Sequence, residues 1–116
     1  MENQTMKEKT IVIGTDFSDT PGGRYRNDGP YSGEIFRDDY LVPALKENDK
    51  VVVDISGVEG YGSSFLEEVF GGLVRLGVFT KEEIGNKLLV KSSDPSKVCF
   101  LERITSYTRA AWEKFK

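Results

Sequence analysis

Apolar residues gather in three short runs that predict β-strands. Thr10–Gly14 (TIVIG) is rich in β-branched residues, a composition typical of strands. Lys50–Ile55 (KVVVDI) and Lys87–Val90 (KLLV) are almost continuously apolar, as expected of strands that are covered on both faces. A further short strand, at the edge of the sheet, could form at Arg24–Arg26.

The segments between these runs predict three helices. Ser32 can cap the first helix, and Pro43 is expected to break or kink it because proline removes a backbone hydrogen bond. A second helix is expected over Ser64–Leu76. Asp94 and Pro95 mark the start of the third, since Asp is favoured at the cap and Pro at the first helical position. The apolar stripe of this last helix is Val98, Leu101, Ile104, Tyr107, Thr108, Ala111 and Phe115.

Strands that alternate with helices predict an α/β domain. We expect a mixed sheet of about four strands packed with about three helices. The 116 residues suffice for one domain with one core. Residues 1–9 are interpreted as a flexible lead-in, and the single domain is expected over 10–116. The turn-rich loop over 16–32 is long for a compact domain, which is typical of a functional or mobile segment.

Composition narrows the classes of function. Sixteen basic and nineteen acidic residues give a net charge of −3, so no nucleic-acid partner is expected. The chain has no histidine and a single cysteine, Cys99, and it therefore lacks the commonest general base and any cysteine zinc site. We expect no metal and no cofactor. A lone thiol, without an apolar segment for a signal peptide or a membrane span, predicts a cytoplasmic protein without a membrane partner.

The most informative stretch runs over Val51–Arg75 (VVVDISGVEGYGSSFLEEVFGGLVR), in which a strand, a glycine-rich turn and a helix follow one another. In α/β sheets, ligands and reactive groups gather at such a strand end, and a helix start favours a phosphate. Ser64 and Glu67 have the spacing of a capping box, which predicts that Ser64 is a cap worth about 1 kcal/mol. Ser63 then lies outside the helix, either as an exposed reactive serine or as an ordinary turn residue.

Two enzyme-like interpretations of this stretch lack residues that their chemistry requires. The spacing from Gly57 to Gly62 is that of a phosphate-binding loop, but Ser63 stands where a lysine must reach the phosphates. The Gly-x-Ser-x-Gly frame of a hydrolase elbow is absent, and without histidine neither serine has its usual base. Nucleotide binding and serine hydrolysis are therefore not expected.

A receiver-like domain phosphorylated on Asp54 remains an alternative, because Asp54 ends the central strand. Asp16 and Asp19 could supply its acidic pair, and Lys91 or Lys97 its lysine. A receiver, however, has a helix directly after its first strand, where this chain has a loop.

One side of the predicted helix carries polar and small residues instead of apolar ones: Glu67, Glu68, Gly71, Gly72 and Arg75. Glycine in an exposed helix costs about 1 kcal/mol relative to alanine, so two adjacent glycines require an explanation. One explanation is close approach by a partner's backbone, and the other is packing under the C-terminal helix or mere tolerance. The candidate partner surface joins this side of the helix to Gly60, Tyr61 and Gly62.

Two runs resemble the STAS-like domain family, which is named for similarity to anti-sigma-factor antagonists: GRYRNDGPYSGEIFRDDYLVPAL and DISGVEGYGSSFLEEVFGGLVR. The resemblance covers residues 22–116. In the better-known antagonists, an Asp-Ser-Ser-Gly motif at the strand–turn–helix corner is phosphorylated on its first serine by a GHKL-type kinase, which releases the partner. By position, the phosphoacceptor falls on Ser63 with Ser64 beside it, while Gly62 and Phe65 replace the flanking residues.

The resemblance implies a STAS-like α/β fold and a non-enzymatic regulatory module that binds a protein, such as a GHKL-type ATPase or another regulator. A phosphate on Ser63 would add about −1.5 to −2 charges close to Glu59, Glu67 and Glu68, and would repel a docked partner. The receiver-like domain stays as one alternative. A small-ligand or anion-binding domain, with the anion held by Arg24, Arg26 and Arg37 around the long loop, is a second alternative. A purely structural subunit without a switch is a third.

Overall fold

Three parallel strands form one sheet in the computed structural model, which describes residues 6–114. The strands are β1 (Glu8–Val12), β2 (Lys50–Asp54) and β3 (Leu88–Lys91), and β2 lies between the other two. The α/β class is confirmed, but the predicted mixed sheet of about four strands is wrong, since each described pairing is parallel.

The strand predicted at Arg24–Arg26 is not formed. Instead, Arg26–Asp28 makes a single 3₁₀ turn, η2, and the N–H of Tyr25 donates to the Asp28 carboxylate at 2.8 Å. Local side-chain hydrogen bonds therefore replace the pairing that a strand would need.

The beginning of the chain differs from the expected lead-in. β1 starts at Glu8, so Glu8 and Lys9 belong to the sheet, while residues 1–5 of the predicted lead-in lie outside the described residues. After β1, a π-helical turn, η1 (Ile13–Phe17), replaces the predicted end of the first strand.

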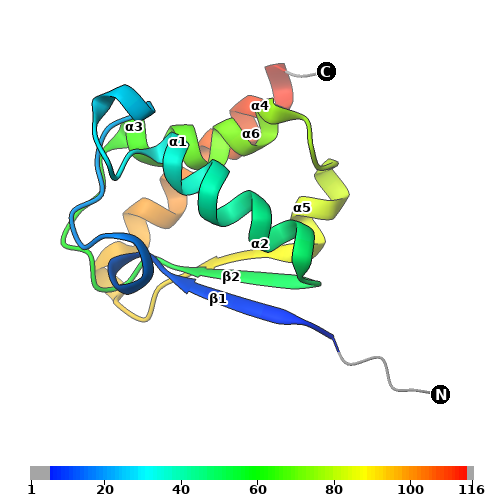
Figure 1. Cartoon of the computed structure of the whole chain (residues 1–116), viewed down its shortest axis with the longest axis horizontal. Coiled ribbons are helices and arrows are strands. Elements are labelled where there is room, and N and C mark those ends of the chain that lie inside the picture. Colours follow the sequence, from blue (N-terminus) through cyan, green and yellow to red (C-terminus); the bar gives the residue numbers. More distant parts are fainter. Residues whose placement is uncertain (1–5, 115–116) are drawn as a thin grey trace.

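Two long helices lie on one side of the sheet (Figure 1). The first, called the α1–α2 helix below, consists of α1 (Gly33–Ile35), the π-helical η3 (Phe36–Leu41) and α2 (Val42–Glu47). The second, the α3–α4 helix, consists of α3 (Ser63–Leu66), the π-helical η4 (Glu67–Gly71) and α4 (Gly72–Leu76).

The ends of these helices agree with the sequence, whereas the break at Pro43 does not occur. Ser32 caps the first helix by accepting from the N–H of Ile35 at 3.3 Å, and Gly77 ends the second helix with a φ of 70°. The first helix continues through Pro43, because this residue lies where π-helical bonding gives way to α-helical bonding. The missing N–H of proline is tolerated where the helical hydrogen-bonding pattern changes.

Two further helices are α5 (Lys81–Lys87) and α6 (Val98–Lys114), the latter preceded by the 3₁₀ turn η5 (Pro95–Lys97). Asp94 caps this start as predicted, by accepting from the N–H of Ser96 at 2.9 Å. The expected stripe residue Phe115 lies outside the described residues. Helix α5 was not predicted, so the described part has four continuous helices instead of about three.

The core lies between the sheet and the helices, which Figure 1 shows above β1 and β2. On the opposite face of the sheet, Thr10 and Leu89 are exposed. The prediction that Lys87–Val90 is covered on both faces is therefore wrong, because no helix of the described part covers β3 at Leu89. Across the described 6–114, no helix has both the length and the apolar character needed to cross a membrane. The fully buried side chains include Ile11, Val51, Val53, Phe36, Leu41, Phe65 and Leu66.

The two long helices are in close contact at Gly33. A Cβ on Gly33 would lie 2.7 Å from the carbonyl oxygen of Phe65 and 3.0 Å from the Cβ of Glu68. Because the nearest of these atoms is backbone, it cannot move aside as a flexible side chain would. Glycine at this position therefore sets the distance between the helices.

We expect Gly33→Ala to lower the free energy of unfolding by about 1–3 kcal/mol, as overpacking does in well-packed cores. Gly85→Ala is the matched control, since Gly85 lies inside α5 and has nothing within 4 Å of its Cβ position. This control should gain about 0.4–1 kcal/mol from helix propensity and chain entropy. Urea unfolding measures both; equal effects of the two substitutions would refute the close approach.

Candidate functional site

The predicted site lies at the carboxyl end of the central strand β2, in the segment 55–62 that leads into α3. We call this segment the corner loop. It turns at Gly57, whose φ of 87° lies in the left-handed region that favours glycine. The Asp54 carboxylate accepts from the N–H of Ser56 at 2.9 Å and so fixes the beginning of the loop. The exposed residues of the loop and of the helix start are Gly57, Glu59, Gly60, Gly62, Ser63 and Ser64.

Ser63 is the first residue of α3, and it is exposed. The residue before it, Gly62, occupies the cap position, and no side chain caps this helix end. The first hydrogen bond of the helix runs from the N–H of Leu66 to the Gly62 carbonyl, at 3.2 Å. The N–H groups of residues 63–65 consequently have no acceptor within the helix, and they carry the positive end of its dipole.

Ser64 is not the predicted cap. The helix begins one residue earlier than expected, and Ser64 is an exposed residue in its first turn. The capping box with Glu67 is not formed, because the Glu67 carboxylate accepts from Arg24 and Arg75 instead. Because the helix starts earlier, Ser63 lies inside it and not outside it as predicted. Ser63 is nevertheless exposed, as expected.

Tyr61 is a core residue and not part of a partner surface. Its side chain is 5% exposed and its ring packs against Phe65 and Phe100. The hydroxyl donates to the carbonyl of Ile55 at 2.9 Å, which closes the corner loop against the end of β2. Burial, together with the charge of Asp54, raises the pKa of the Tyr61 hydroxyl. Its neighbours Gly60 and Gly62 stay exposed.

The segment that follows β3 holds the other side of the corner loop. Lys97 is almost buried, donates to the carbonyl of Glu59 at 3.3 Å and lies 3.5 Å from the Asp94 carboxylate. The Ser56 hydroxyl accepts from the N–H of Ser93 at 2.8 Å. The contacts of Lys97 with Glu59 and of Ser93 with Ser56 were not predicted, because they join residues that only the parallel pairing of β2 and β3 brings together.

The surroundings of Asp54 differ from those of a receiver phosphoacceptor. The Asp16 carboxylate accepts from the N–H of Val12 at 2.7 Å, and Lys97 contacts Glu59 and Asp94. Among the described residues, no three His, Cys, Asp or Glu side chains lie close enough together to hold a metal ion. The acidic cluster that the receiver-like alternative requires is therefore not formed.

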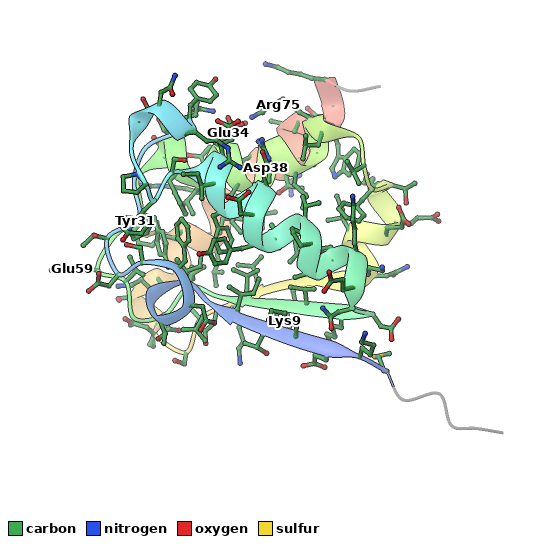
Figure 2. The ribbon with its side chains drawn as sticks, in the orientation of Figure 1. Lys9, Tyr31, Glu34, Asp38, Glu59 and Arg75 are labelled. Carbon is green, nitrogen blue, oxygen red and sulfur yellow. The ribbon has the colours of Figure 1, made fainter. Side chains whose placement is uncertain are left out.

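The helix side predicted to dock a partner holds an internal charge network. Glu68 is 7% exposed, and its carboxylate lies 2.5 Å from Arg37 Nη1 and 3.0 Å from Arg24 Nη1. Glu67 lies 2.6 Å from Arg24 and 2.5 Å from Arg75. Figure 2 shows Arg75 near the top of the molecule, far from Glu59 on the corner loop. We call these five side chains the charge network.

Gly71 and Gly72 make room for the charge network. A Cβ on Gly72 would meet the Arg37 guanidinium and the Glu68 carboxylate, and one on Gly71 would meet the Glu67 carboxylate. Both glycines are buried. The docking surface expected at Glu67, Glu68, Gly71, Gly72 and Arg75 is therefore largely covered, and only Arg75 among them is classed as exposed.

The expected anion site at Arg24, Arg26 and Arg37 is not formed either. Each guanidinium already has carboxylate partners: Arg26 pairs with Asp39 at 2.7 Å, and Arg37 pairs with Asp38 at 2.8 Å as well as with Glu68. These pairings raise the pKa of the arginines against the opposing effect of burial. The arginines consequently connect the long loop to the two long helices.

The comparisons identify the family. The fold and the corner loop define a small α/β domain with three parallel strands. A family model described as "STAS-like domain of unknown function (DUF4325)" matches residues 32–98, which is more than half of the chain. The chain belongs to this family, and the resemblance seen in the sequence is confirmed. No curated protein and no solved structure matches the chain.

The charge network makes stability depend on pH. Hydrogen bonds from Arg75 and Arg24 hold the pKa of Glu67 at about 2, below its usual 4.5. Because the folded pKa is the lower one, this stabilisation is present above pH 4.5 and is lost as the pH falls towards 2. We expect Glu67→Gln to cost about 1 kcal/mol at pH 7, since partial exposure weakens the pairing, and much less at pH 2.

Urea unfolding at several pH values measures this difference. Glu102→Gln, on an exposed position of α6, is the control and should stay close to the wild type at each pH. A deficit of Glu67→Gln that stays constant down to pH 2 would contradict the assignment.

The uncapped start of α3 predicts that a negative charge at position 63 stabilises the fold. Ser63→Asp should raise the free energy of unfolding by about 0.3–1 kcal/mol, because a negative charge interacts favourably with a helix N-terminus. Ser106→Asp adds the same charge at an exposed position inside α6 and should bring no gain. Thermal unfolding at low and high salt checks both, and the gain at position 63 should shrink as salt screens it. A gain of equal size at position 106 would contradict the role of the helix end.

Proposed function

We propose that this chain is a non-enzymatic regulatory module that binds a protein partner through the corner loop and the start of α3, with Ser63 as its phosphoacceptor. One observation carries the proposal: Ser63 is exposed at the first position of a helix that no side chain caps. A phosphate on this residue would lie at the positive helix end, beside N–H groups without acceptors in the helix.

The proposed partner surface is smaller than the one expected from the sequence. Gly57, Gly60 and Gly62 have nothing within 4 Å of their Cβ positions, so a partner's backbone can approach the corner loop closely. The rest of the loop is held from beneath by Tyr61 and Lys97. A loop of fixed shape loses little conformational entropy when a partner binds it.

A phosphate on Ser63 would change binding more than folding. The carboxylates of Glu67 and Glu68 are offset by Arg24, Arg37 and Arg75, so their repulsion of a phosphate is weaker than the sequence predicts. The phosphate would bring about −1.5 to −2 charges to a surface that carries the exposed Glu59. A partner suited to the neutral serine would therefore meet strong new repulsion and desolvation costs.

The proposed kinase and partner rest on the family resemblance. Family membership supports the STAS-like fold. In the antagonists that this family resembles, a GHKL-type kinase modifies the serine at the corner. We propose the same class of protein, a GHKL-type ATPase or another regulator, as the partner here. The absence of histidine supports a binding role over catalysis, because Ser63 lacks the usual base.

Capture of partners from a native lysate tests this function. Wild type, Ser63→Ala and the control Ser106→Glu should recover the same partner, whereas Ser63→Glu should recover at least about tenfold less. Phosphopeptide mapping of the protein purified from its native cells should find phosphate on Ser63. Recovery by Ser63→Glu equal to the wild type, or phosphate that persists in Ser63→Ala, would remove Ser63 from the mechanism.

A further inference from the structure

β1 lies at an edge of the sheet, and β2 is its neighbour there. The N–H of Lys7 donates to the Asp49 carboxylate at 2.9 Å, and the Lys7 carbonyl accepts from the N–H of Asp49 at 2.8 Å, so the backbone of Lys7 faces β2. Backbone groups of successive strand residues point to opposite sides. The backbone groups that point away from β2 are consequently those of Glu8, Thr10 and Val12.

The end of β1 gives independent support for this alternation. The N–H of Val12 donates to the Asp16 carboxylate, at 2.7 Å, instead of to a strand. Asp16 thereby closes the outer edge at the end of β1. The N–H and C=O groups of Glu8 and Thr10 remain as the outward part of the edge, which is the arrangement that a further strand can join.

A groove of about 490 Å³ runs along this edge, between β1 and the α1–α2 helix. Its apolar part includes the buried side chains of Ile11 and Ala44, together with Pro43 and the half-exposed ring of Tyr40. An extended chain in this groove would pair its backbone with Glu8 and Thr10. Its alternate side chains would then pack beneath the helix, as in other cases of strand addition.

Charge indicates what kind of chain fits the groove. Three carboxylates line it, those of Asp16, Asp39 and Glu47, against the single cation of Lys9. Arg26 offsets Asp39 at 2.7 Å, which still leaves an acidic excess. A second copy of this chain would bring the same acidic rim against itself, which disfavours self-pairing.

The opposite edge of the sheet is less suited to a strand. β3 borders a larger groove of about 610 Å³ between α5 and α6, but the N–H of Leu88 already donates to the carbonyl of Ile84. Its charged lining mixes Lys81 and Arg109 with Glu113. The outer edge of β1 therefore has both the larger set of outward backbone groups and the clearer charge preference.

We propose that β1 binds an extended peptide rich in lysine or arginine as a fourth strand of the sheet. The basic side chains lie on the face of the added strand beneath the α1–α2 helix, where their aliphatic stems pack against the apolar part of the groove and their charged ends reach its carboxylates. β-branched apolar side chains alternate with them on the other face, where they favour an extended strand. The site is separate from the corner loop, and it does not depend on the proposed role of Ser63. The charges on Lys7, Glu8 and Lys9 keep the edge from pairing indiscriminately.

The probe is a fluorescent peptide of alternating lysine and valine, about six residues long, which is the usual length of a strand. Anisotropy with the full chain should show saturable binding that weakens as salt is raised, and a glutamate–valine peptide of equal length should not bind. Thr10→Pro should weaken binding at least about tenfold, because it removes an outward N–H at an edge position where proline is tolerated. Thr10→Val keeps that N–H and should bind like the wild type.

Charge reversal supplies a second variant that leaves the strand backbone intact. Glu47→Lys should weaken binding about fivefold, whereas Glu102→Lys on α6 should leave it unchanged. Hydrogen exchange of the Glu8 and Thr10 amides should slow at least tenfold in the presence of the peptide, since pairing protects them. This exchange measurement decides the question even where Thr10→Pro impairs folding.

Three results would overturn the proposal. Equal binding by Thr10→Pro and Thr10→Val would exclude strand addition, provided that both variants unfold cooperatively. Equal binding of the lysine and glutamate peptides would exclude the assigned charge preference. A dimer in light scattering that Thr10→Pro dissociates would make a second copy of the chain the occupant of this edge.

Discussion

The structure depends on the burial of the Glu68 carboxylate between the two long helices. A charge this far from water is stable only when cations and hydrogen-bond donors surround it, and Arg37 and Arg24 provide them. Arg37 comes from the α1–α2 helix and Arg24 from the loop before it. One carboxylate thereby fixes two helices and a long loop. Gly33 and Gly72 leave space around Glu68, as Gly71 does around Glu67.

The elements that the sequence predicted well are those whose pattern is local. β2 and β3 are continuous apolar runs, and the helix ends at Ser32 and Gly77 follow from capping chemistry. Helix α5 has few apolar positions, and only its capping box, in which Thr80 and Glu83 exchange hydrogen bonds, could have indicated it. The number of strands was overestimated because basic and aromatic residues in a turn resemble a short edge strand.

The position of the candidate site was predicted from the sequence, but the side-chain contacts that hold it in place were not. The exposure of Ser63 was expected from its place next to a predicted helix start, whereas its proposed role came from the family resemblance. The predicted partner face failed because charged residues on one helix side also suit an internal network. The partners of Glu67 and Glu68 come from more than 30 residues away as well as from the same helix, and no local pattern indicates such contacts. Tyr61 and Lys97 were missed for the same reason, since both support the corner loop through contacts that depend on the folded chain.

The position of Arg24 has a consequence for the size of the autonomous folding unit. The stretch that the family shares, 32–98, contains Glu67 and Glu68 but neither Arg24 nor β1 nor the greater part of α6. A polypeptide cut to that stretch would retain two strands, and its buried carboxylate would have lost one of its cations. In this protein, the segments before and after the shared stretch therefore complete the hydrophobic core as well as the electrostatics. The segment before the shared stretch must supply a cation and an edge strand, and the segment after it must supply a covering helix.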